Sequence, residues 1–291
     1  MTHTTRDLIP AFLNPTAGNA DASRRALRAA GGFDIHEVAP DALASSVRAA
    51  ADAGSRRVLV AGGDGSIGAA AAVLANRNTE LAILPSGTLN HLAKDIGVPL
   101  DLDYAAHVAL EGTATAADAA LVNHRLFLNT SSVGAYVTFV RLRERLERRI
   151  GYGAASFIAA LRLLYRLPVF RVTLEVDGAA REYLTPLVFV GVGERELKLP
   201  TLGARVPRGR PGLHVMIIRR RSGARTLALA LAAAARGVSA VAQTPAMDVF
   251  LVESLRIETH AKLAAVDGEL VAVASPLEYR HAPGCLRIVA P

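Results

Sequence analysis

VLVAGGDGSIGAA, residues 58–70, joins an apolar run to a glycine-rich turn and then to a run of small residues. The apolar run predicts a buried strand, and the residues after the turn predict a helix. Glycines at such a junction let the backbone come close to a ligand, and the N–H groups at the helix start bind anions. Asp64 would repel a phosphate directly, so it fits such a site if Mg²⁺ or a sugar hydroxyl lies between them. The alternative is an ordinary strand-to-helix turn in which Asp64 is a cap.

The next predicted strand is followed by a turn of the same kind, in ILPSGTLNHLAKD, residues 83–95. Ser86, Gly87 and Thr88 offer hydroxyls and backbone donors at a helix start. Asn90 and Lys94 are four residues apart, which places them on one face of that helix. One such turn is weak evidence, but two turns on successive strands indicate a shared site.

A third turn follows the first predicted strand, in FLNPTAGNA, residues 12–20. Asn14 and Pro15 end the strand, and Gly18 opens the path to the next helix. Taken alone it is an ordinary turn. In parallel α/β sheets ligands bind beyond the carboxyl ends of the strands, so the three turns predict one crevice.

The order of predicted elements divides the chain into two domains. Strands and helices alternate over about the first 100 residues, which predicts an α/β domain with a mainly parallel sheet and helices on both faces. After residue 118 short strands predominate and predict an antiparallel β-sandwich, interrupted by one long helical region at 136–167 and a helix at 224–241. We therefore expect domains at 1–118 and 119–291, and the last strand is free to return to the first domain.

Composition limits the classes of function. Lys and Arg number 33 against 26 Asp and Glu, a net charge of +7, which suits polyanionic ligands or anionic headgroups as well as simple solubility. The sequence has no zinc-finger or RNP motif, so we expect no nucleic-acid partner. The single cysteine, Cys285, excludes a disulfide framework. The N-terminus lacks the apolar segment of a signal peptide, and the longest apolar tract is too short to span a bilayer, so we expect a cytoplasmic protein.

The three turns resemble those of the diacylglycerol kinase catalytic-domain family, in particular the bacterial soluble lipid kinases, which are related to sphingosine kinases and more distantly to NAD kinases. The motifs stand here as NPTAG, GGDGS and GTLNHLAKD, with His91 in place of the family's second aspartate. The resemblance implies that ATP and Mg²⁺ bind between the two domains. The cofactor-binding candidates, from the turns and the resemblance together, are Asn14, Gly18, Gly63, Asp64, Gly65, Ser66, Ser86, Gly87, Thr88 and Asn90.

A carboxylate that accepts the proton of an attacking hydroxyl is expected in the second domain. LEVDGAAREY, residues 174–183, and AAVDGELVAV, residues 264–273, both read as hairpins with an Asp-Gly turn, and local sequence does not choose between them. The family's Asp-Gly-Glu motif matches the second. The resemblance therefore implies Asp267 as the base or a metal-linked carboxylate, with Glu269 as the alternative base and Asp64 as the other metal candidate.

The resemblance implies an ATP-dependent lipid kinase that phosphorylates the hydroxyl of diacylglycerol or a related lipid alcohol. A kinase of a soluble metabolite, like NAD kinase, and a nucleotide- or lipid-binding relative without turnover are the alternatives. The basic segment RLRERLERRIGYG, residues 141–153, reads as a solvated, salt-bridged helix or as a peripheral contact with an anionic membrane surface. The oligomeric state is left open, a homodimer being one option.

Overall fold

The computed structural model describes residues 8–87, 90–165, 169–176, 178–196, 204–206, 208–219 and 247–291. The helix predicted at 224–241 lies outside these residues. The chain divides into two compact units: Met1–Ala119 with Ala282–Pro291, and Ala120–His281. The chain thus leaves the first unit within one strand and re-enters it for its last ten residues.

A parallel sheet forms the centre of the first unit. Its strands β1 (Ile9–Leu13), β2 (Phe33–Glu37), β3 (Arg57–Gly62) and β4 (Glu80–Pro85) lie in the order β2-β1-β3-β4. The end of β16 (Leu277–Ala290) pairs in parallel with the free side of β4, where Ile288 lies opposite Leu81. Residues 58–61 are completely buried, which is typical of a strand with helices on both of its faces.

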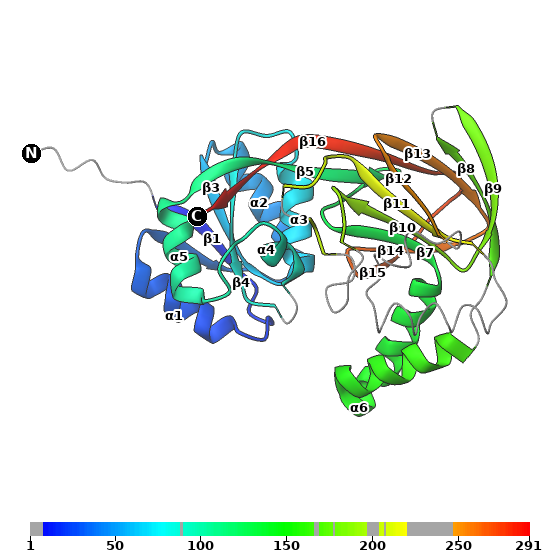
Figure 1. Ribbon diagram of the computed structural model, residues 1–291. Coiled ribbons are helices and arrows are strands. Elements are labelled where there is room, and N and C mark those ends of the chain that lie inside the picture. The colour runs from blue at the N-terminus through cyan, green and yellow to red at the C-terminus, as the bar shows by residue number, and fades with distance from the viewer. Residues whose placement is uncertain are drawn as a thin grey trace, which may run out of the picture. The chain divides into compact units, whose positions relative to one another are not determined.

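Five helices of the described chain belong to this unit: α1 (Ala20–Ala30), α2 (Leu43–Asp52), α3 (Asp64–Leu74), α4 (His91–Asp95) and α5 (Leu102–Glu111). In Figure 1, α1 and α5 pack together on one side of the sheet, and α2 packs against α3 on the other. From β1 the chain goes to β2 on one side, while β3 lies on the other side of β1. The order therefore reverses between β1 and β3, and in such folds ligands bind beyond the carboxyl ends of the strands at this point.

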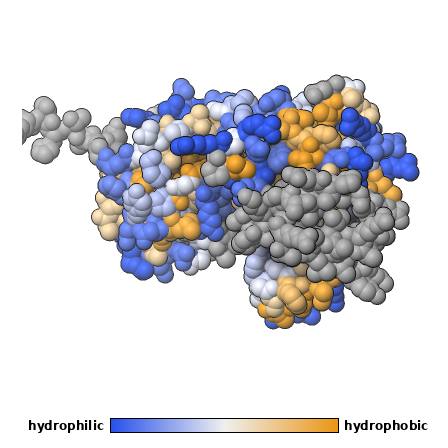
Figure 2. All heavy atoms as spheres, viewed as in Figure 1, coloured by the Kyte–Doolittle hydropathy of each residue, from blue (hydrophilic) through white to orange (hydrophobic). Residues whose placement is uncertain are grey.

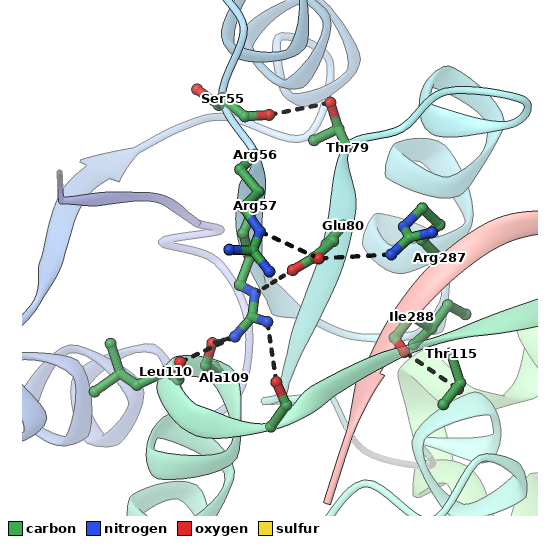
Figure 3. A network of polar contacts seen from close by, with 11 residues as sticks. Ser55, Arg56, Arg57, Thr79, Glu80, Ala109, Leu110, Thr115, Arg287 and Ile288 are labelled. Carbon is green, nitrogen blue, oxygen red and sulfur yellow. Dashed lines mark hydrogen bonds and ion pairs between the residues drawn. The ribbon is translucent and has the colours of Figure 1, made fainter. Parts of the chain in front are cut away.

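A charged network secures the opposite, amino-terminal ends of β3 and β4 (Figure 3). The buried carboxylate of Glu80 lies 2.8 Å from Arg57 Nε and 3.8 Å from Arg287. The Arg57 guanidinium also donates to the carbonyl oxygens of Ala109, Leu110 and Gly112, at the end of α5. This cluster ties the C-terminal segment and α5 to the sheet, away from the three turns.

The second unit is a β-sandwich, as predicted, with antiparallel strands throughout its described part. One sheet joins β16 to β13 (Ser254–Thr259), β8 (Phe170–Val176) and β9 (Ala179–Thr185), with β5 (Thr113–Val122) and β6 (Arg125–Phe127) off that path. The other has the order β12 (Met247–Val252), β11 (Leu213–Ile218), β10 (Leu187–Val192), β7 (Thr130–Gly134), β14 (Leu263–Val266), β15 (Glu269–Ala272). Apolar side chains from both sheets form one core, which includes Val133, Val190, Val215, Ile257 and Leu277.

Helix α6 and strand β16 differ from the sequence prediction. The long helix α6 (Ala135–Tyr165) is interrupted at Gly151, whose φ of 76° and ψ of 164° are not helical. The runs SPLEYRHAP, residues 275–283, and CLRIVAP, residues 285–291, read in the sequence as two short strands on either side of Gly284. They form the single strand β16, because Gly284 adopts a φ of 57° within the strand without ending it.

Candidate active site

The three glycine-containing turns of the first unit lie in contact with one another. The Asn14 amide donates to the Ser66 hydroxyl at 3.5 Å, which joins the turn after β1 to the turn after β3. The turns after β3 and β4 meet through glycine backbone: a Cβ added to Gly87 would lie 2.4 Å from the Gly63 Cα. At position 87 such an approach is open only to glycine, whereas a Cβ on Gly63 would lie 3.3 Å from the Gly87 Cα, a tight contact.

The N-terminus of α3 presents backbone donors that find no acceptor among the described residues. Gly63 is extended, with φ −88° and ψ −176°, and the first amide to find an acceptor in this turn is that of Ile67, which donates to the Gly63 carbonyl. The N–H groups of the first helical residues, 64–66, have no acceptor within the helix. Together with the helix dipole they favour an anion, and Gly65 is exposed to receive one.

Asp64 links the turn after β3 to the helix after β4. Its two carboxylate oxygens accept the backbone N–H groups of His91 and Leu92, each at 3.1 Å. These are the first two residues of α4, whose own N-cap residue makes no capping bond with its side chain. Asp64 is therefore a cap, as the ordinary explanation of the motif expects, but it caps the neighbouring helix.

Asn90 braces its own turn. Its Oδ1 accepts the Gly87 N–H at 3.0 Å, and its Nδ2 donates to the Gly87 carbonyl at 2.8 Å and the Pro85 carbonyl at 3.3 Å. The residue is buried and adopts a positive φ of 49°. These contacts hold the shape of the turn that contains Thr88, which lies outside the described residues.

The remaining predicted residues of the first unit differ in accessibility. The Asn14 Oδ1 accepts both the N–H and the hydroxyl of Thr16, at 2.9 and 2.8 Å, which fixes the turn after β1. Gly18 is exposed in that turn. Ser86 is fully buried, and its hydroxyl points back to the Leu84 carbonyl at 3.4 Å. The structure thus leaves Gly18 open to solvent and places the Ser86 side chain inside the fold.

In the second unit, Asp267 and Gly268 form the two-residue turn between β14 and β15. Both have positive φ, 47° and 87°, as a type I′ turn requires. The Asp267 carboxylate accepts three consecutive backbone N–H groups, those of Leu128, Asn129 and Thr130, at 2.8 to 2.9 Å. The turn is therefore fastened to the segment that enters β7. Asp177, at the rival Asp-Gly turn, lies outside the described residues.

Burial raises the pKa of Asp267 above its ordinary value, because desolvation disfavours the charged carboxylate. The three N–H donors and the positive charge of Arg195 act in the opposite direction. A carboxyl group in this balance resembles the perturbed acids that occur at functional sites.

Arg195 is a buried cation that the motif search did not identify. Its guanidinium donates to the carbonyl oxygens of Val192 and Asn129 and to the Asn129 side-chain oxygen, and its backbone N–H donates to His214 Nδ1 at 2.8 Å. Asn129 also donates its own N–H to Asp267. Arg195 therefore fixes the backbone at Asn129, which in turn binds the Asp267 carboxylate. The available signal was the pair of charged residues Glu194 and Arg195, shortly after the buried run of β10.

Glu269 has a different environment. It is the first residue of β15, its side chain is 56% exposed, and it forms an ion pair with Arg125 at 2.7 Å. Its carboxylate is thus open to solvent and to substrates, whereas that of Asp267 is turned into the protein.

Two further findings concern the described residues only. They contain no group of three His, Cys, Asp or Glu side chains arranged to hold a metal ion. Among their helices, none combines the length and the apolar character needed to cross a bilayer.

Parts of the chain are similar in sequence to known proteins. Residues 9–122 match the model of the diacylglycerol kinase catalytic domain. A protein of Cronobacter sakazakii named probable lipid kinase YegS-like is 33% identical over 153 residues, which cover 50% of each chain. A relative of the same name from Pseudomonas aeruginosa is 40% identical over 119 residues, which cover 40% of this chain and 38% of that one. The matches thus span half or less of the length of these curated relatives.

Solved structures share the whole fold. A crystal structure from Bacillus anthracis str. Sterne superposes with a TM-score of 0.75 at 21% identity, covering 98% of this chain and 97% of that one. A second crystal structure from that organism, named a diacylglycerol kinase, has a TM-score of 0.68 at 19% identity with the same coverage. The fold is therefore that of the diacylglycerol kinase-like proteins.

Proposed function

We propose that this protein is an ATP-dependent lipid kinase that transfers the γ-phosphoryl group to the hydroxyl of diacylglycerol or a related lipid alcohol. The observation that carries the proposal is the contact of three turns at the N-terminus of α3, within the matched catalytic domain. Phosphoryl transfer needs little covalent chemistry from the protein and depends on positioning and charge stabilisation. Glycine turns that present backbone donors serve both purposes.

The first unit fits the triphosphate of ATP. The amides of residues 64–66 and the dipole of α3 would hold phosphate oxygens, and Gly63 and Gly65 would let the chain approach them. Mg²⁺, when bound, would neutralise the charge of the phosphates. Mg²⁺ usually takes one or two carboxylates together with substrate phosphates and water. Asp64 fits that limited role, because each of its oxygens accepts one N–H and keeps a lone pair.

The second unit supplies the proposed base. The accessible Glu269 is the better placed of the two candidates to accept the proton of a lipid hydroxyl. Asp267, which three N–H donors engage, would set the position of the turn from which Glu269 follows. Asp267 and Glu269 thus take separate roles, one positioning and one catalytic.

The proposal is tested with radiolabelled ATP, Mg²⁺ and mixed vesicles that contain diacylglycerol, followed by chromatography of the lipid product. We expect label in the lipid fraction. Label in NADP alone, from parallel reactions with NAD, would establish the NAD kinase-like alternative. Binding of ATP without transfer to any lipid alcohol would establish the binding protein without turnover.

The role of Glu269 is tested with the variant Glu269→Gln. We expect turnover to fall about 10²- to 10⁴-fold, the usual contribution of a general base, while the melting temperature stays near that of the parent. Arg125→Gln is the matched control, since it removes the ion pair but keeps the carboxylate. If Glu269→Gln retains full turnover, the base is another group.

A further inference from the structure

The break at Gly151 divides α6 into two segments of different character. The segment before it, residues 135–150, contains five arginines and two glutamates. Between residues 151 and 163 the only charged residue is Arg162. A basic helix segment thus adjoins an apolar one.

The basic segment presents arginines outward. Arg141, Arg145, Arg148 and Arg149 are exposed, and their spacing places them on one side of the helix. The fifth, Arg143, is largely covered and lies 3.5 Å from Glu144 and 3.6 Å from Glu147. It therefore pairs with both glutamates of the segment, and in the part of the chain that the structure describes no ion pair is formed by the four exposed arginines.

The apolar segment presents large apolar side chains outward. Ala155 and Ala159 are fully buried and mark the side that packs on the protein. Phe157 is 71% exposed and Leu161 is 58% exposed, four residues apart on another side. A surface helix normally carries polar residues there. Figure 2 shows this apolar surface where Figure 1 places α6. The Arg143 guanidinium lies 5.3 Å from the centre of the Tyr152 ring, so it connects the basic segment to the apolar one.

We propose that Arg141, Arg145, Arg148, Arg149, Phe157 and Leu161, here called the α6 face, bind the surface of a bilayer that contains anionic phospholipid. The arginines would contact headgroup phosphates, and Phe157 and Leu161 would enter the boundary of the acyl chains. Charge complementarity selects this partner, because the face carries cations without acidic partners beside exposed apolar groups. A nucleic acid would leave Phe157 and Leu161 in water. The inference rests on the proposed function, whose acceptor lipid lies in a bilayer.

The test is cosedimentation with vesicles of phosphatidylcholine alone or with phosphatidylglycerol, without nucleotide. We expect binding to the anionic vesicles that weakens as salt is added. Arg145→Gln/Arg149→Gln should weaken it about 30-fold, since each arginine near such a surface contributes about fivefold. Phe157→Ser/Leu161→Ser should weaken it roughly tenfold or more, because apolar area no longer leaves water.

Matched controls remove the same groups elsewhere in the second unit. Arg171→Gln/Arg256→Gln removes two exposed arginines of β8 and β13, and Leu184→Ser removes an exposed leucine of β9. These variants should bind within about twofold of the parent. Equal losses in controls and test variants, or vesicle binding that none of the changes affects, would overturn the proposal.

Two other binding partners of the α6 face, a second copy of the chain and DNA, would give distinct results. Sedimentation equilibrium that shows a dimer of the parent and a monomer of Phe157→Ser/Leu161→Ser, without vesicle binding, would make the face an interface between two copies. Binding to duplex DNA with no binding to vesicles would also overturn the proposal. Transfer to a water-soluble, short-chain diacylglycerol separates this inference from the proposed function. Vesicle binding without that activity would contradict the kinase, and that activity without vesicle binding would contradict the α6 face.

Discussion

The carboxylate of Asp64 accepts the backbone N–H of Leu92 at 3.1 Å, across 28 residues of sequence. With the second bond to His91, it makes one side chain part of two turns. The carboxylate therefore helps to fix the turn after β3 relative to the start of α4, together with the close approach of Gly63 and Gly87.

Asp64→Asn should weaken that connection. The new NH₂ group would face one of the two N–H donors, and since the His91 N–H is exposed and the Leu92 N–H is part-buried, we expect a loss of about 0.5–1.5 kcal/mol in unfolding free energy. MgATP affinity should fall at least tenfold, because the turn and the metal-facing charge both change. Urea denaturation and calorimetry measure the two effects. Asp103→Asn, an exposed aspartate in the first turn of α5, is the control. Equal MgATP affinity in both variants would remove Asp64 from the site.

Gly87→Ala should separate the turns after β3 and β4. The added methyl would lie 2.4 Å from the Gly63 Cα, and neither backbone can yield without moving its turn. We expect about 1–3 kcal/mol of destabilisation, as for other overpacked sites, and loss of nucleotide binding. Gly68→Ala in α3 is the matched control, because a Cβ there meets open space and alanine favours the helix by up to about 1 kcal/mol. Normal ATP binding by Gly87→Ala would contradict a site built on this contact.

Asp267→Asn should loosen the β14–β15 turn. An amide offers one oxygen to three N–H donors and points its own donor at another, so unfolding free energy should fall by about 1–3 kcal/mol. Hydrogen exchange should accelerate at residues 128–130 specifically. Glu269→Gln serves as the comparison, since it alters an exposed side chain and should leave this exchange unchanged. Unaltered protection in Asp267→Asn would show that the carboxylate does not hold the segment.

We expect the free energy of unfolding to fall as the pH is lowered, because His214 becomes protonated. Burial lowers the pKa of His214 from its ordinary 6.5; Glu194 opposes this shift, and Arg195 and Arg210 add to it. Its Nδ1 accepts the Arg195 N–H, which a protonated ring cannot do. The folded pKa lies below the unfolded one, so the contribution is present above pH 6.5 and is lost as pH falls toward the folded pKa.

The free energy of unfolding should change by at most about 1.4 kcal/mol per pH unit because of this one group. Urea denaturation from pH 5 to pH 8 measures it. In His214→Asn, whose side-chain oxygen can accept the same N–H without titrating, the slope between pH 5 and 6.5 should flatten. The same slope in both proteins would assign the pH dependence to other groups.

Local sequence patterns were sufficient for the elements that propensity and periodicity determine. The helix expected after Gly18 is α1, and the strands expected before the turns at Gly63 and Ser86 are β3 and β4. Helix α5 was not predicted, although Asp101 gives the usual N-cap signal and accepts the Tyr104 N–H at 2.9 Å. The break of α6 at Gly151 was missed because a single glycine can also continue a helix.

The sequence predicted which turns form the candidate site, but not which groups the individual side chains of those turns bind. Sequence spacing brought Asn14, Ser66 and Gly87 to one edge of the sheet. It could not show that Asn90 bonds to its own turn or that Asp64 caps α4, because both depend on where a neighbouring turn lies in space. Arg195 belongs to the same category, since two of its acceptors belong to Asn129, 66 residues away in sequence.

The position of the C-terminal end of β16 affects when the first unit can finish folding during synthesis. Ile288 pairs with Leu81 and Arg287 reaches Glu80, yet the ribosome makes those partners about 200 residues apart. The second unit is complete at His281, whereas one edge of the parallel sheet stays unprotected on the nascent chain until residues 282–291 have been made. The unit that is encoded first is therefore expected to mature last, and removal of residues 282–291 would destabilise the unit whose other residues are encoded first.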